Sequence, residues 1–168
     1  MALRNILTAP DPALEKPCRP VKDFNQRLHQ LLDDMAETLD HADGVGLAAP
    51  QVGVLRRVVL VMETNVPEDE EPYIIELINP VILETEGEQH EPEGCLSVPG
   101  EFGIVKRPAK VKVRAQDRFG DFFEVEGTGL TAVCFCHELD HLDGIVFTEK
   151  CERMLTEEEL QGKKEPED

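Results

Sequence analysis

The stretch that most constrains this chain is CHELDH at residues 136–141, which matches the pattern H-E-x-x-H. On a helix, side chains four residues apart lie one turn apart on the same face. His137 and His141 can therefore bind one metal ion together, with Glu138 beside them as a general base. The pattern predicts a catalytic metal centre. Because such centres usually have three protein ligands, one ligand besides the two histidines is still to be found in the chain.

The sequence around these histidines predicts a buried helix. Glycines precede it at positions 127 and 129, and Asp143 with Gly144 ends it. One helical face is formed at i, i+3, i+4, i+7 and i+11 by Leu130, Val133, Cys134, His137 and His141. A chance pair of histidines on an exposed helix would have polar neighbours, so the apolar stripe favours a functional site.

Composition limits the function classes. A chain of 168 residues with 40% hydrophobic residues is predicted to form a single domain, 1–168. It has no apolar run long enough to span a membrane and no signal-peptide core, and its five cysteines are an odd number, which favours a reducing cytosol and a cytoplasmic location. The net charge of −18 opposes binding to nucleic acid or to an anionic membrane.

The remaining sequence predicts an α+β fold. A long helix is expected to open at Asp23, with Gln26 completing a capping box, and to present an apolar face as far as Leu39. Strands are expected at 57–62, 73–77 and 81–84, with a bend at 79–80 between the last two, and a hairpin pairs 111–115 with 123–125. These patterns predict antiparallel sheets packed around the HExxH helix, together with the long N-terminal helix.

Shorter segments are less regular. A helical turn is expected at 11–14, a loop around His90, a short helix at 152–160 and a mobile tail at 161–168.

Several residues could supply the third ligand. The metzincin pattern fails because position 147 is Phe147, and the acidic residues 157–159 are better explained as a solvated helix face. Cys134 lies seven residues before His141, about 10.5 Å along a helix axis, which is too far for a short thiol to share one ion. Cys95, next to the flexible Gly94, remains the best candidate, although a lone cysteine is also compatible with an inert buried thiol.

Three stretches, GVGLAAPQ at 44–51, EGCLS at 93–97 and HELDH at 137–141, together resemble the three signature motifs of the peptide deformylase family. The resemblance extends from about Leu3 to Met154. It implies removal of the formyl group from the N-terminal formylmethionine of new polypeptides, with release of formate. The expected substrates are N-formylmethionyl nascent peptides.

The resemblance also implies roles for individual residues. The metal ligands would be Cys95, His137 and His141, holding Fe²⁺ in the cell, with Zn²⁺, Ni²⁺ or Co²⁺ able to replace it. Glu138 would be the catalytic acid/base, while the Gln51 side chain and the Leu96 amide would hold the oxyanion. The substrate would be bound by Val45, Gly46, Leu130, Val133 and Cys134.

Many bacterial members of this family carry a longer, basic C-terminal helix that docks on the ribosome. Residues 152–168 are short and acidic, which disfavours docking by that route, while transient ribosome association by another route stays open. Two alternatives remain: a metalloprotease that uses the same helix on internal peptide bonds, and a non-catalytic metal-binding module.

Overall fold

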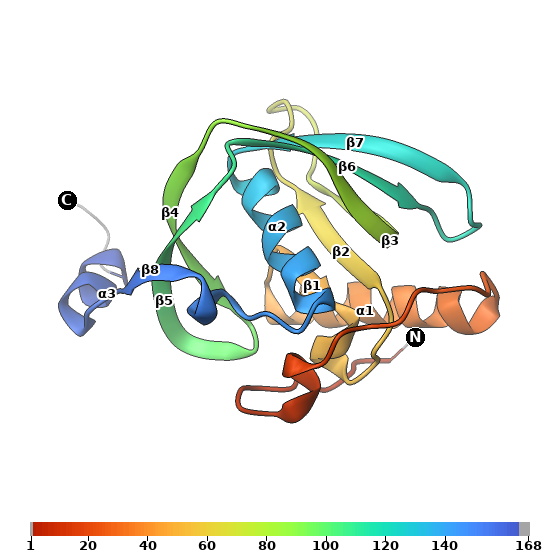
Figure 1. The fold of residues 1–168 in the computed structure, drawn as a ribbon, viewed down its shortest axis with the longest axis horizontal. Coiled ribbons are helices and arrows are strands. Elements are labelled where there is room, and N and C mark those ends of the chain that lie inside the picture. The colour runs from red at the N-terminus through yellow and green to blue at the C-terminus, as the bar shows by residue number, and fades with distance from the viewer. Residues whose placement is uncertain (1, 165–168) are drawn as a thin grey trace.

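Figure 1 shows a computed structural model of the chain, in which residues 2–164 are described. Two antiparallel sheets form the framework. The larger has the order β1-β2-β3-β6-β7, with bounds Gly46–Ala48, Val58–Glu63, Tyr73–Glu86, Lys110–Gln116 and Phe122–Thr128. The smaller has the order β4-β5-β8, with bounds Gln89–Cys95, Val98–Arg107 and Cys151–Met154.

The helices occupy different places around these sheets. Helix α2, Leu130–Leu142, lies between the two sheets, and α1, Gln26–Ala42, covers the other face of the larger one (Figure 1). Helix α3, Glu157–Lys164, follows β8. Short 3-10 helices occupy Pro12–Glu15, Ala49–Val52 and Phe147–Glu149. The predicted α+β class with antiparallel sheets is confirmed.

Strand β2 links the two halves of the core. Its alternate residues Val59 and Val61 pack in the cluster that contains Phe135 of α2, while Val58 and Leu60 pack in the cluster formed with α1. Because successive side chains of a strand point to opposite faces, this run of apolar residues is buried on both sides. Helix α2 therefore packs against a strand whose opposite face is buried against α1.

The predicted start of the long helix is wrong. Helix α1 begins at Gln26, and the Asn25 side chain, not that of Asp23, caps it by accepting a hydrogen bond of 3.1 Å from the Leu28 amide. Asparagine and aspartate serve equally well as N-caps, so the residue type does not explain why Asn25 and not Asp23 caps the helix. The position of Asn25 in the folded chain explains it. The helix continues beyond Leu39 to Ala42 and ends at Asp43 in a left-handed conformation.

Two predictions for the strands are also wrong. The bend expected at 79–80 is an irregularity inside the continuous strand β3, where Asn79 has a φ of 51° and the register with β6 shifts between Ile78 and Val81. The Asn79 side chain accepts a hydrogen bond from the Val21 N–H through Oδ1 and donates one to the Val21 carbonyl through Nδ2. These two bonds hold Asn79 in this conformation. His90 belongs to β4 and not to a loop.

The C-terminal prediction is wrong in its boundaries. Residues that were expected to open a helix form β8, which pairs with β5, and α3 starts only at Glu157. This helix runs through Lys164, into the segment predicted as a tail, and 165–168 lie outside the described residues. The hairpin of β6 and β7 and the helical turn near Asp11 are confirmed. Within residues 2–164, no helix is long and apolar enough to cross a membrane.

Candidate metal centre

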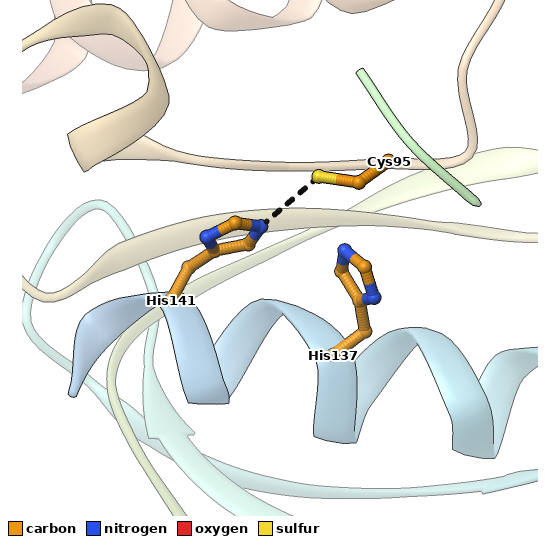
Figure 2. A group of neighbouring side chains, drawn as sticks. All are labelled: Cys95, His137 and His141. Atoms are coloured by element: carbon orange, nitrogen blue, oxygen red, sulfur yellow. Dashed lines mark hydrogen bonds between the residues drawn. The ribbon is translucent and has the colours of Figure 1, made fainter. Parts of the chain in front are cut away.

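Three side chains from two distant elements converge at one point. Cys95 comes from the end of β4, while His137 and His141 project from successive turns of α2 toward it (Figure 2). One ligand atom of each lies within 4.8 Å of the others, and Cys95 Sγ is 3.3 Å from His141 Nε2. The structure thus brings together the three residues predicted as ligands.

The donor set fits a divalent transition metal. Sulfur with two imidazoles suits zinc and ferrous iron, and three protein ligands leave a fourth position open for chemistry. His137 Nδ1 lies 2.9 Å from Glu93 Oε1, so its Nε2 is left for an ion. A carboxylate on the far nitrogen is the usual support for a ligand histidine, because it fixes the ring and its tautomer.

Burial and charge set the protonation of the two histidines. Burial opposes protonation of His137, but nearby negative charge, chiefly that of Glu138, outweighs it and raises the pKa to about 10. Burial, reinforced by the neighbouring His137, lowers the pKa of His141 to about 3, so this ring is neutral at pH 7. Metal binding would release the His137 proton, because a ligand imidazole is neutral on the binding nitrogen.

Glu138 lies beside the centre with unused hydrogen-bonding capacity. Its Oε1 atom is buried and has no hydrogen-bond partner among the described residues. Burial raises the pKa of Glu138 to about 7, which suits a group that must take and return a proton near neutrality. A Cβ atom at Gly46 would lie 2.5 Å from Glu138 Oε2, so a larger residue there would displace this carboxylate.

Gln51 reaches the centre from the 3-10 helix that follows β1. Its Oε1 accepts a 2.9 Å hydrogen bond from the Ala48 amide, and its Nε2 donates to Ser97 Oγ at 3.0 Å. The same Nε2 lies 3.6 Å from Cys95 Sγ. Gln51 is buried, so these bonds fix the amide against the sulfur. Leu96 follows Cys95 directly, and both Leu96 and Gln51 line a cavity at the centre.

A cavity of about 500 Å³ opens onto the centre. All five predicted substrate-binding residues line it: Val45, Gly46, Leu130, Val133 and Cys134. Burial, with the Glu138 charge adding to it, raises the pKa of Cys134 to about 12, so this thiol stays protonated. Cys134 is outside the three-residue ligand cluster, as the helix geometry predicts.

Other candidate ligands are engaged elsewhere. Glu159 pairs with Arg153 and bonds Thr156 at the start of α3, and His90 binds Glu88 and Glu152. Phe147, at the position of the missing metzincin histidine, stacks on His137 with ring centroids 5.9 Å apart.

The sequence reasoning missed a charged network behind His137. The Arg107 guanidinium binds both oxygens of Glu93, at 2.8 and 3.0 Å, and reaches Asp140 Oδ2 at 2.7 Å. The position of Glu93, two residues before Cys95, was a usable signal, whereas Arg107 carries none in the sequence. Ser97 was also missed, although it lies in the same quoted stretch.

Aromatic packing shapes one side of the cavity and was likewise not foreseen. A Cβ atom at Gly94 would meet the Phe102 ring at 2.5 Å, so β4 needs glycine there for β5 to lie close. Phe102 lines the cavity together with Pro92 and Pro99.

Comparison with known proteins identifies the family. The model of the family described as polypeptide deformylase matches residues 3–157. A peptide deformylase of Caldanaerobacter subterraneus subsp. tengcongensis is 52% identical over 165 residues, covering 98% of this chain and 99% of that protein. The crystal structure of a peptide deformylase from Legionella pneumophila aligns with a TM-score of 0.81 at 39% identity, over 98% of this chain and 99% of that one.

A further related structure is that of a peptide-bound enzyme. The Met-Ala-Ser-bound class I type b peptide deformylase from Acinetobacter baumannii aligns with a TM-score of 0.81 at 35% identity, over 88% of this chain and 98% of that one. The match to the family model covers most of the chain, and the relatives match it almost end to end. Together with the convergent cysteine, histidines and glutamate, these likenesses show that the chain belongs to the polypeptide deformylase family.

Proposed function

We propose that Cys95, His137 and His141 hold one divalent metal ion with which this enzyme removes the formyl group from N-terminal formylmethionine. The observation that carries the proposal is the convergence of these three donors beside the unpaired Glu138 carboxylate, at a cavity of about 500 Å³. An ion held there supplies Lewis acidity, which polarises a carbonyl group and makes water a better nucleophile. By resemblance to the family, Fe²⁺ is the ion in the cell, and Zn²⁺, Ni²⁺ or Co²⁺ can replace it.

Glu138 moves the proton in this scheme. Its carboxylate takes a proton from the attacking water as the oxygen bonds to the formyl carbon, and then gives it to the peptide nitrogen as the C–N bond breaks. The products are formate and a free amino terminus. Burial raises the pKa of this carboxyl above its ordinary value, which favours a group that both accepts and returns a proton.

Two donors stabilise the charge that develops on the formyl oxygen. These are the Gln51 side-chain amide and the backbone N–H of Leu96. The hydrogen bonds from Gln51 to Ser97 and from Ala48 to Gln51 hold that amide in place before substrate arrives. Donors fixed in advance lose little free energy to reorganisation, and removing one typically lowers kcat ~100-fold to ~1000-fold.

The cavity supplies selectivity for the methionine side chain. Val133 and Cys134 form a buried apolar wall on α2, and the more exposed Val45 and Leu130 lie at the rim. A protonated thiol behaves as a small apolar group and suits an unbranched thioether. The related Acinetobacter enzyme, whose structure contains the tripeptide Met-Ala-Ser, supports the placement of a peptide here.

The direct test measures formate released from formyl-Met-Ala-Ser by metal-loaded protein. Glu138→Gln should keep its metal, as measured by elemental analysis, and lose at least ~100-fold in kcat because proton transfer is removed. Met-Ala-Ser without the formyl group should stay intact by mass spectrometry. Cleavage at an internal peptide bond would instead support a metalloprotease, and loss of metal from Glu138→Gln would make Glu138 a ligand.

A further inference from the structure

A second cavity lies at the start of α1, between residues 19–25, the first turns of this helix and the segment 53–56. Its volume is about 720 Å³, and none of its lining residues lines the cavity at the metal centre. Five of the 17 lysines and arginines of the chain line it: Arg4, Arg19, Lys22, Arg27 and Arg56. Such a gathering of cations is notable in a protein with a net charge of −18.

Most of these cations are not neutralised. Arg4 forms an ion pair with Asp34, but no ion pair within the described residues involves Arg19, Lys22 or Arg27. Among the residues that the structure describes, Asp23 is the single carboxylate that lines the cavity. The backbones of Arg19 and Arg56 are held side by side in a parallel bridge, so two guanidinium groups start from adjacent points.

The start of α1 adds to the unbalanced positive charge. Arg27 lies in the first turn of this 17-residue helix, and that turn contains no acidic residue. Cations at a helix N-terminus are unfavourable, since the partial charge of the helix dipole there is also positive. An anion bound in the cavity would relieve both repulsions at once.

We propose that this cavity binds a phosphate-bearing anion of nucleotide size. Arginine forks match phosphate oxygens in geometry and charge, and the volume is within the range of small-molecule sites. The apolar part of the wall, which includes Val21, Leu31 and Val54, provides a surface for the uncharged half of the ligand. An extended polyanion such as RNA would have to cross the acidic remainder of the surface, so the concave shape and the charge favour a compact ligand.

The experiment is calorimetric titration of metal-loaded protein with ADP at low salt. The test variant is the double change Arg19→Ala and Arg27→Ala. The matched control is Lys110→Ala with Arg153→Ala, which removes two exposed cations away from the cavity and changes the net charge equally. Loss of each arginine–phosphate contact should weaken ADP binding about tenfold, hence about 100-fold for the test variant.

The control variant should bind ADP as the unchanged protein does, and added salt should weaken binding in both. All three proteins should release formate at the same rate, because no cavity residue belongs to the metal centre. Absence of ADP binding to the unchanged protein, or equal weakening in both variants, would overturn the proposal. So would a 20-nucleotide RNA that bound more tightly than ADP through Arg19 and Arg27, since the cavity would then be a docking site for RNA.

Discussion

Two histidine–carboxylate pairs in this molecule share their chemistry and differ in their surroundings. His137 Nδ1 meets Glu93 Oε1 behind the metal centre, and His90 Nδ1 meets Glu152 Oε1 across the smaller sheet. The side chains of the first pair are 7% and 3% exposed, whereas those of the second are 44% and 49% exposed. The first pair continues through the buried Arg107 to Asp140, whereas the second continues through Glu88 to Lys106, and both of those side chains are exposed.

Burial changes what such a pair does. A carboxylate taken out of water is costly unless each of its oxygens is paired, and Glu93 meets this condition with His137 and both prongs of Arg107. The hydrogen bonds from these partners outweigh the effect of burial and keep the pKa of Glu93 below its usual range. Around His90, water can replace either partner, so geometry alone does not make the contact important.

The largest effect is expected from Arg107→Ala. This change leaves the buried Glu93 carboxylate without its main cation, and breaking a buried pair in this way costs about 3–5 kcal/mol of unfolding free energy. Urea denaturation measures it. Arg153→Ala, which breaks the exposed pair with Glu159, is the matched control and should fall within experimental error of the unchanged protein. Equal losses of unfolding free energy in the two variants would mean that burial does not make the Arg107 pair more important than the Arg153 pair.

A smaller effect is expected from Glu93→Gln, which keeps the shape but removes the charge behind His137. Metal affinity should fall about 10-fold to 100-fold, the usual result of changing an outer partner of a ligand histidine. Competition with a chelator of known affinity measures it. The corresponding change in the exposed pair, Glu152→Gln, should leave metal affinity unaltered.

The smallest effect is expected from His90→Gln, and it should depend on pH. The hydrogen bonds with Glu152 and Glu88 raise the pKa of His90 in the folded protein. A raised pKa means that the contribution to stability is fully present below the unfolded pKa of about 6.5 and disappears as pH rises through the folded value. The unchanged protein should therefore exceed the variant slightly in Tm at pH 5.5 and match it at pH 9. A constant difference at both pH values would show that the ring acts by packing alone.

Much of the site follows from local spacing in the sequence. Helix geometry can be read directly from a sequence. It accounts for the i, i+4 spacing of the histidines, for the apolar stripe of α2, and for the distance that excludes Cys134 as a ligand. Elimination of the other candidates left Cys95 as the third ligand, and the resemblance of three short stretches added Gln51 and the expected roles of both residues. Contacts between distant strands are not displayed in this way, and Arg107 reaches Glu93 only because β4 and β5 pair in one particular register.

The errors in the fold have the same origin. Asn25 and Asp23 are equivalent as caps until the path of residues 17–25 is fixed by its contacts with Asn79. Residues 151–154 have an unremarkable pattern and become a strand because the β5 edge offers backbone partners. Tertiary contacts decided both cases, and local propensity did not.

The three proposed metal ligands also connect two parts of the chain. Cys95 belongs to the smaller sheet and His141 to a helix packed mainly on the larger one, and they lie 46 positions apart in sequence. An ion bound by both residues would link the smaller sheet to α2. Because the ion binds only when the two are folded together, its binding free energy would add to the free energy needed to separate them. Chelation should therefore speed hydrogen exchange at the amides of β4 and β5 while those of β2 and β3 keep their protection. The smaller sheet would then be the first part of the enzyme to open whenever its metal is lost.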